Sequence, residues 1–102
     1  MIYCFDIDGT LCTNTFGEYP KALPITGRIE IVNKLYENGH IIKLFTARGS
    51  TTKINCRNLT ESQLSKWGVK YHSLELGKPE ADIYIDDKSK NDKEFFDLNL
   101  DN

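Results

Sequence analysis

The sequence predicts an α/β protein, a Rossmann-like three-layer sandwich with a mostly parallel sheet. Two observations predict it. Short apolar runs alternate with helical patterns, and acidic or hydroxyl residues follow several of those runs directly. Alternating strands and helices are typical of parallel sheets with helices on their faces. A chain of 102 residues is long enough for one domain and too short for two, so we expect a single domain over 1–102.

Each element is predicted from its local pattern. Continuous apolar runs indicate buried strands, spaced apolar residues indicate helices, and clusters with glycine and proline indicate loops. In chain order, the expected elements are a strand at 2–7, a loop at 9–24, a helix at 26–38, a strand at 41–45, an irregular segment at 49–59, a helix from 60 to about 68, a strand at 71–76, a strand at 81–85 and a helix at 91–98.

Several details of this map can be tested. The first strand is apolar enough for burial on both faces, and we expect Cys4 to be buried within it. We expect Thr26, Thr60 and Asn91 to cap the three helices, because their side chains can accept hydrogen bonds from free backbone amides.

Composition narrows the class of function. The chain is 39% hydrophobic and 27% charged, with a formal net charge of −2 and no basic block, so we expect neither a nucleic-acid nor a membrane partner. We see no targeting signal and no apolar run of membrane-spanning length, and we therefore expect a cytoplasmic protein. The three cysteines match no zinc pattern. Cys12 follows the first polar cluster, which makes it a candidate reactive thiol on the ground of proximity alone.

Carboxylates and a threonine follow predicted strands. Asp6 and Asp8 end the first strand, Thr46 follows the second, and Asp86 and Asp87 follow the strand at 81–85. In open parallel sheets, ligands bind at the carboxyl ends of the strands. Four carboxylates at one edge would repel one another unless a cation neutralised them, and Mg²⁺ prefers oxygen ligands of this kind. The pattern therefore predicts a magnesium site.

These segments resemble the four motifs of the haloacid dehalogenase superfamily. The resemblance rests on FDIDGT at 5–10, Thr46 in LFTAR, Lys78 in GKP and Asp86–Asp87 in YIDDKS, and it extends from residue 2 to about residue 92. It implies a magnesium-dependent phosphatase that hydrolyses a phosphate monoester through an aspartyl-phosphate intermediate. The segments at 9–24 and 49–59 are too short for a cap domain, so the resemblance implies a capless core.

The resemblance also implies a role for each motif residue. Asp6 would be the nucleophile and Asp8 the general acid and base. Thr46 and Lys78 would bind the phosphoryl group. Asp86, with Asp6 and the backbone carbonyl of Asp8, would hold the metal.

Other residues around the phosphate are less specific. Backbone amides after Asp6, loosened by Gly9, would add donors to the phosphoryl oxygens. Two readings of Arg48 stay open, in which it holds substrate or braces its loop. Asp87 is either a second metal ligand, through water, or a partner of Lys78. Lys88 is an alternative to Lys78 as the phosphate-binding lysine. The further residues predicted around the phosphate are Gly9, Ala47, Arg48 and Asp87.

The sequence leaves the substrate and the partners open. We expect a small-molecule phosphate ester, with a sugar or polyol phosphate ahead of a phosphoprotein or a nucleic-acid end. A phospho-acceptor receiver domain and a non-catalytic binding domain are the rival classes, and the receiver is disfavoured because no Asp ends the second or third strand. A homo-oligomer is a further hypothesis. In such an oligomer, the segment at 9–24, with the apolar side chains Phe16, Tyr19, Leu23 and the adjacent Ile25, or the segment at 49–59 would screen a partner's site. The alternative is that these apolar side chains pack on their own sheet.

Overall fold

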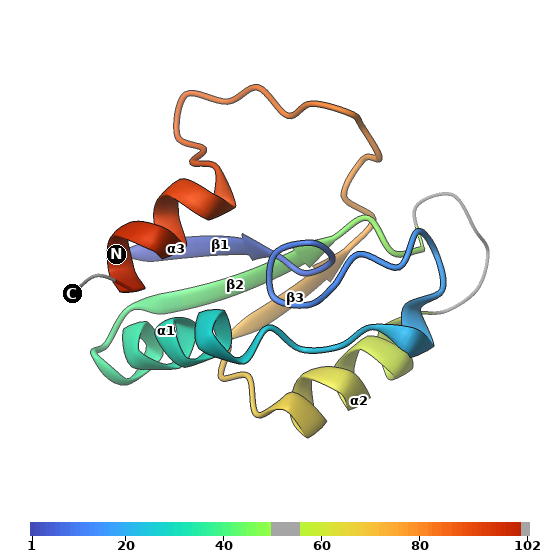
Figure 1. The fold of residues 1–102 in the computed structure, drawn as a ribbon, viewed down its shortest axis with the longest axis horizontal. Helices are drawn as coiled ribbons and strands as arrows, with labels where there is room; N and C mark the ends of the chain where they lie inside the picture. Colours follow the sequence, from blue (N-terminus) through green and yellow to red (C-terminus); the bar gives the residue numbers. More distant parts are fainter. Residues whose placement is uncertain (50–55, 101–102) are drawn as a thin grey trace.

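The computed structural model describes residues 1–49 and 56–100, and its elements follow the predicted alternation (Figure 1). A short 3₁₀ helix, Tyr19–Lys21, interrupts the loop at 9–24. The other elements are β1 (Ile2–Asp6), α1 (Thr26–Glu37), β2 (Ile41–Thr46), α2 (Arg57–Trp67), β3 (Ser73–Leu76) and α3 (Asp92–Leu100).

The three strands form one parallel sheet in the order β1-β2-β3. Parallel pairing places Phe5 beside Leu44, and Leu44 beside Leu74. The Rossmann-like α/β class with a parallel sheet is thereby confirmed. Because the strands are parallel, their carboxyl ends meet at one edge of the sheet, where Asp6 and Thr46 lie.

One face of the sheet carries the core. Phe5, Leu44 and Leu74 belong to a buried apolar cluster that also contains side chains from all three α-helices. The helical members include Val32 of α1, Leu64 of α2 and Phe96 of α3. Full burial of one such side chain stabilises the fold by about 1.5–3 kcal/mol, so this cluster holds the helices on the sheet.

The other face of the sheet is more exposed. Side chains alternate between faces along a strand, so Ile2 and Cys4 point away from the row that contains Phe5. Ile2 is 60% exposed, its neighbour Ile41 in β2 is 41% exposed, and Cys4 is also exposed. The predictions that the first strand is buried on both faces and that Cys4 is buried are therefore wrong. The described helices pack on the Phe5 row and leave this second row at the surface.

Two of the three predicted helix caps are wrong. Ile25 occupies the N-cap of α1 and Cys56 that of α2, and neither forms a side-chain capping hydrogen bond. Thr60 lies within α2 because its hydroxyl bonds the carbonyl of Cys56 one turn earlier, at 2.7 Å. Asn91 does precede α3, where its side-chain oxygen accepts a hydrogen bond from the amide of Lys93 at 3.0 Å.

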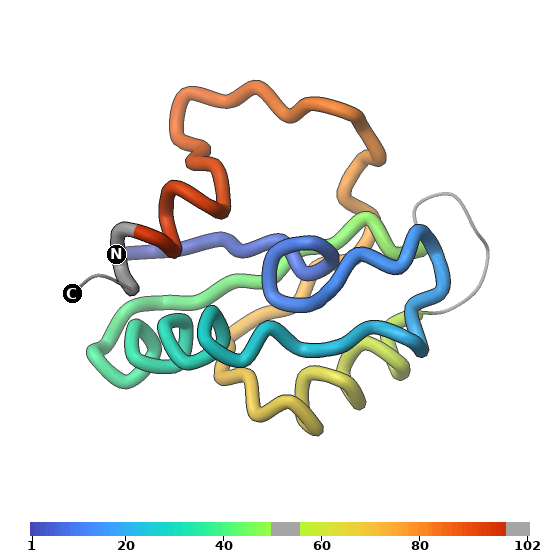
Figure 2. The backbone as a smooth tube through the Cα atoms, viewed as in Figure 1, coloured from blue at the N-terminus to red at the C-terminus, as the bar shows by residue number. Residues whose placement is uncertain are grey.

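The predicted strand at 81–85 is not formed. Residues 79–91, which we call the arm, lie outside the described strands, and every one of them is exposed. The arm bows away from the sheet and returns at α3 (Figure 2). Its alternating apolar residues favour a strand, but the arm has no pairing partner among the described strands. Of the predicted irregular segment at 49–59, residues 50–55 lie outside the described residues.

Among the described residues, no helix has the length and apolar character needed to cross a membrane.

Candidate active site

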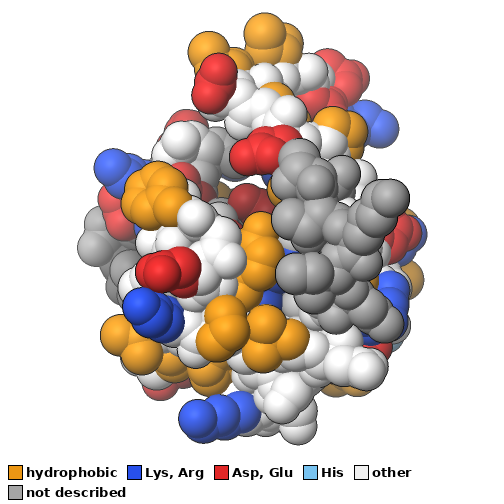
Figure 3. All heavy atoms as spheres, turned by 90° about the vertical axis from the view of Figure 1, so that its right-hand side faces the viewer, with side chains coloured by type: hydrophobic (Ala, Val, Ile, Leu, Met, Phe, Trp, Pro, Cys, Tyr) orange, Lys and Arg blue, Asp and Glu red, His pale blue; other side chains and the backbone are white. Residues whose placement is uncertain are grey.

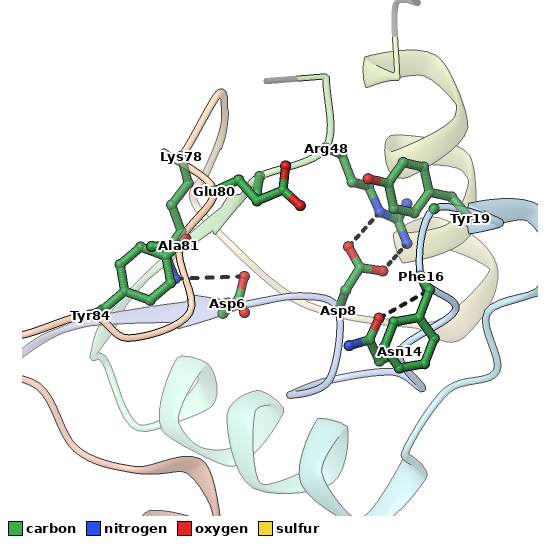
Figure 4. Close-up of a pocket in the computed structure, with 12 residues that line it drawn as sticks. Asp6, Asp8, Asn14, Phe16, Tyr19, Arg48, Lys78, Glu80, Ala81 and Tyr84 are labelled. Atoms are coloured by element: carbon green, nitrogen blue, oxygen red, sulfur yellow. Dashed lines mark hydrogen bonds and ion pairs between the residues drawn. The ribbon is translucent and has the colours of Figure 1, made fainter. Parts of the chain in front are cut away.

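A cavity of about 500 Å³ opens at the carboxyl edge of the sheet. It brings together Asp6, Asp8, Arg48 and Lys78, which three separate segments of the chain supply (Figure 4). Figure 3 looks onto this end of the molecule, where apolar and acidic side chains reach the surface. The site predicted from the strand ends is therefore assembled in part.

Asp6 ends β1 and faces Lys78. The Lys78 Nζ atom lies 4.0 Å from Asp6 Oδ1, and the two side chains are 14% and 34% exposed, respectively. Burial raises the pKa of Asp6 above its ordinary value of 3.8, while the positive charge of Lys78 opposes that rise. Asp6 is thus a partly dehydrated carboxylate whose charge is stabilised by the cation beside it.

Two aromatic rings hold the Lys78 ammonium. Its Nζ atom lies 4.3 Å from the ring centre of Phe45 and 3.8 Å from that of Tyr84. These distances allow cation–π attraction, which favours a cation at this place. The Lys78 amide also donates to the Thr46 carbonyl at 2.9 Å, which fixes the backbone beside β2. Lys88 lies in the exposed arm and does not line the cavity, so Lys78 is the one of the two candidate lysines that lies at the cavity.

Asp8 is held by Arg48 through two hydrogen bonds. Arg48 Nε donates to Asp8 Oδ2, and Arg48 Nη2 donates to Asp8 Oδ1, each at 2.9 Å. The Arg48 side chain is 0% exposed and that of Asp8 is 18% exposed. A bidentate pair of this kind fixes both the position and the plane of the carboxylate. Arg48 therefore sets the direction in which Asp8 faces the cavity.

The remaining guanidinium donor of Arg48 binds α2. Arg48 Nη1 donates to Thr60 Oγ1 at 3.1 Å and to Gln63 Oε1 at 2.6 Å. The Tyr19 ring lies over the guanidinium, with its centre 4.6 Å from Cζ. Because all three guanidinium nitrogens donate to protein and the side chain is 0% exposed, the structure favours the reading in which Arg48 braces the site over the one in which it binds substrate.

Thr46 and Ala47 lie where the sequence places them. Thr46 is 1% exposed. Its hydroxyl donates to Asp8 Oδ2 at 3.4 Å and accepts a hydrogen bond from the Arg48 amide at 3.1 Å. Ala47 lines the cavity. The threonine is therefore tied to Asp8 in this conformation, and a phosphoryl oxygen would have to compete for its hydroxyl.

The loop after Asp8 is closed by its own amides. Gly9 has φ 80°, a conformation that favours glycine, and its amide donates to the Cys12 carbonyl at 2.9 Å. The amides of the next three residues, 10–12, all donate to the carbonyl of Ile7. The prediction that these amides point at a phosphate is therefore wrong for Gly9 and for 10–12, because they are used to build the turn.

Cys12 is not a reactive thiol in this structure. It is buried, and its Sγ atom lies 3.7 Å from Asp8 Oδ1. Burial, together with the negative charge of Asp8, raises the pKa of the Cys12 thiol to about 12. At neutral pH the group is therefore a protonated thiol that packs beside the site.

The structure does not bring Asp86 and Asp87 to the cavity. Both are exposed in the arm, and Asp86 Oδ1 accepts a hydrogen bond from the Lys88 amide at 2.8 Å. That hydrogen bond lowers the pKa of Asp86, as expected for a carboxylate in a surface turn. Their roles around a metal stay predictions.

The described residues do not fit a magnesium ion in this conformation. No group of three or more His, Cys, Asp or Glu side chains within 1–49 and 56–100 could hold a metal. Asp6 lies at the predicted edge, whereas the Asp8 carboxylate is bound by Arg48 through both oxygens, which leaves only the backbone carbonyl of Asp8 as its predicted ligand. Glu80 also lines the cavity but forms no such group with Asp6 and Asp8, and Asp86 would have to come from outside the cavity as it stands.

Sequence reasoning missed several residues of the site. Thr60 and Gln63 are three residues apart on α2, a spacing that places both on one helix face, but nothing in the sequence says which face meets Arg48. Phe16 lines the cavity with φ 54°, a conformation rare for a residue other than glycine, and is 91% exposed. Phe16 and Tyr19 belong to the apolar side chains of 9–24 for which the sequence left screening of a partner's site or packing on their own sheet open, whereas the lining residues Asn14, Gly17, Glu80, Ala81 and Tyr84 were not singled out.

Comparisons with known proteins give structural neighbours only. No protein-family model matches the chain, and no curated protein does. A crystal structure of a target from Vibrio cholerae is 29% identical, with a TM-score of 0.86, over 98% of this chain and 90% of that one. A chain of the Pnkp1/Rnl/Hen1 complex is 25% identical, with a TM-score of 0.59, over 84% of this chain and 30% of that one. These similarities make a haloacid-dehalogenase-like fold plausible without establishing family membership.

Proposed function

We propose that this protein is a phosphatase that hydrolyses a phosphate monoester, with Asp6 as the nucleophile. One observation carries the proposal. At the mouth of the cavity, the Asp6–Lys78 pair and the Asp8–Arg48 pair face the same space from one edge of a parallel sheet. Two carboxylates with separate cationic partners suit a reaction in which one attacks and the other transfers a proton.

The proposed reaction has two steps. In the first, a carboxylate oxygen of Asp6 bonds to phosphorus, the bond from phosphorus to the ester oxygen breaks, and protonated Asp8 gives its proton to that leaving oxygen. In the second, Asp8 takes a proton from water, the water oxygen bonds to phosphorus, and the bond to Asp6 breaks. Inorganic phosphate and free Asp6 result.

The two neighbouring cations, Lys78 and Arg48, would have different roles in this reaction. Lys78 would balance negative charge on Asp6 and on the phosphoryl oxygens, which is the main form of catalysis in phosphoryl transfer. Arg48 would keep Asp8 aimed at the leaving oxygen. Because Arg48 holds both Asp8 oxygens, protonation of Asp8 must release one of those hydrogen bonds.

We also propose that the hydrolysis requires magnesium. When bound, it would reduce the repulsion between the carboxylates and the phosphate. We expect activity to need added magnesium and to disappear in excess chelator. Full turnover in chelator would remove magnesium from the proposal and leave the roles of Asp6 and Asp8 standing.

The test is hydrolysis of a panel of phosphate monoesters by the purified chain with magnesium. We expect wild-type turnover and a loss of at least about 1000-fold in Asp6→Asn, because an amide cannot attack phosphorus as a carboxylate does. Asp97→Asn, a change at an exposed carboxylate of α3, is the matched control and should keep full activity. Equal activity in Asp6→Asn and wild type would sink the assignment.

The same panel addresses the substrate. We propose a small sugar or polyol phosphate, because the chain has a net charge of −2 and no basic block to bind nucleic acid. Preference for a phosphopeptide or for a phosphorylated nucleic-acid end would replace that substrate class. No turnover of any ester would favour a non-catalytic binding domain.

A further inference from the structure

The arm exposes apolar side chains in an alternating pattern. Ile83 is 75% exposed and Ile85 is 93% exposed, and both lie in the segment 81–85 whose sequence predicts a strand. Exposed apolar surface of this kind is unfavourable in water and commonly marks a contact with another chain. The Vibrio cholerae structure matches 98% of this chain, so the match includes most of the arm.

A matching site is present on the sheet. β1 pairs with β2 along one edge, and none of the described strands pairs with its second edge. An unpaired edge offers a row of backbone donors and acceptors to any further strand. Ile2 and Cys4 are exposed along the same strand. Within 1–49 and 56–100, the molecule thus has both an unpaired strand-like segment and an unpaired edge.

The arm cannot fill the edge of its own sheet as a parallel strand while Lys78 stays in the cavity. Lys78 is tied to the Thr46 carbonyl, and the three residues from there to Ala81 span at most about 11 Å. A parallel strand would have to begin beside Ile2, about 13 Å back along β1 and about 10 Å to the side. The required distance exceeds the reach of the chain.

We propose that two copies of this chain exchange arms, so that residues 81–85 of each pair in parallel with the free edge of β1 in the other. The register that sets Asp86 beside Asp6 also sets Ile83 beside Tyr3 and Ile85 beside Phe5, on the face that carries the apolar core. The exchange is symmetric, so both free edges and both arms are satisfied at once.

The exchange also completes the site. It brings Asp86 of one copy to Asp6 and Asp8 of the other, which adds a carboxylate to a cavity whose described acidic side chains in one chain form no group that could hold a metal. This part rests on the proposed function, whereas the pairing of the arms does not. A single copy would then carry the nucleophile and its lysine, and the second copy would carry the acidic ligand.

Disulfide trapping tests the pairing directly. In the proposed register, residue 84 lies beside Cys4 on the same face, so Tyr84→Cys treated with diamide should give a covalent dimer on a non-reducing gel. Ile83→Cys is the matched control; its side chain points to the opposite face, and we expect several-fold less dimer. A disulfide within one chain, equal trapping in both variants, or no trapping would overturn the proposal.

Light scattering at micromolar concentration tests the assembly. We expect twice the 11.7 kDa chain mass for wild type and the single-chain mass for the double variant Ile83→Asp/Ile85→Asp. Leu23→Asp changes a side chain that is 65% exposed outside the arm and should remain a dimer. A wild-type monomer, or a dimer that survives the arm substitutions, contradicts arm exchange.

Mixed dimers test the shared site. Asp6→Asn and Asp86→Ala are each expected to be inactive alone. Refolded together in equal amounts, they should recover about one quarter of wild-type activity, because half of the dimers are mixed and each has one complete site. No recovery, with active wild type, shows that the site is not shared. If wild type itself hydrolyses nothing, the proposed function fails, while trapping and light scattering still decide the arm exchange.

Discussion

The two halves of the site are built differently. The Asp8–Arg48 half is joined to α2, with an arginine side chain that is 0% exposed and donates to Thr60 and Gln63 as well as to Asp8. The Asp6–Lys78 half is open, with a longer ion pair of 4.0 Å and an arm residue, Tyr84, over the lysine. One half is fixed by the fold, and the other depends on where the arm lies.

This difference means that the Asp8–Arg48 pair holds a fixed position, whereas the Asp6–Lys78 pair can change its geometry. A buried bidentate pair loses stability when it is broken, because a charge is left without a partner. A partly exposed pair can lengthen or change partner at little cost. The fixed half therefore suits directed proton transfer by Asp8, and the adjustable half suits entry of a phosphate between Asp6 and Lys78.

The largest expected effect comes from removing the arginine. Arg48→Met should lower the free energy of unfolding by about 3–5 kcal/mol, because it breaks a buried ion pair and leaves Asp8 without its partner. Urea denaturation measures the loss. Lys66→Met, at an exposed position of α2, is the matched control and should change stability little. A loss below about 1 kcal/mol in Arg48→Met would show that the pair does not hold the site.

A smaller loss is expected from the partner of Arg48 on α2. Gln63→Leu removes a 2.6 Å hydrogen bond to a charged donor and should cost about 1.5–3 kcal/mol. Ser62→Ala changes the exposed neighbouring position and serves as the control in the same denaturation experiment. If both variants unfold at the wild-type urea concentration, the α2 contact contributes nothing to the fixed half.

The open half should respond to pH. Burial raises the pKa of Asp6 above 3.8, so ionised Asp6 is less favourable in the folded chain than in the unfolded one. Its contribution to stability is therefore present below pH 3.8 and is lost as pH rises through the higher folded pKa. Asp6→Asn should melt at a higher temperature than wild type at pH 7, with a smaller difference at pH 3.5. An equal difference at both values contradicts this assignment.

The smallest expected effect lies in the arm. Asp86→Ala removes a fully exposed carboxylate whose hydrogen bond is local, to the Lys88 amide. We expect the free energy of unfolding to change by less than about 0.5 kcal/mol. Thermal melts beside Ser89→Ala, another exposed arm position, provide the check. A loss above about 1 kcal/mol would mean that Asp86 supports the fold.

Much of the fold was predictable because local patterns dominate it. The apolar runs at 2–7 and 41–45 became β1 and β2, and the spaced apolar residues after Ile25 became α1. Thr60 was predicted as a helix cap because threonine is common both at helix starts and at buried hydrogen-bonding positions. Only the folded structure, in which Arg48 donates to the Thr60 hydroxyl, shows that Thr60 takes the second role.

The strand predicted at 81–85 failed for a different reason. Its alternating apolar residues favour an extended backbone. A strand also needs a neighbouring strand to pair with, and the periodicity of a segment does not show whether one is present. The pairing is restricted by the short link from Lys78, a constraint that depends on the hydrogen bond to Thr46. The predicted position of Asp86 at the sheet edge failed with the strand.

The three cysteines differ in a way that makes the chain easy to label. Cys12 and Cys56 are buried, and burial raises the pKa of the Cys12 thiol to about 12, so almost none of it is thiolate at neutral pH. Cys4 is exposed on β1. A maleimide dye at neutral pH should therefore attach at Cys4 in the native chain without any engineered substitution. The dye would report, by its fluorescence, whatever approaches that strand.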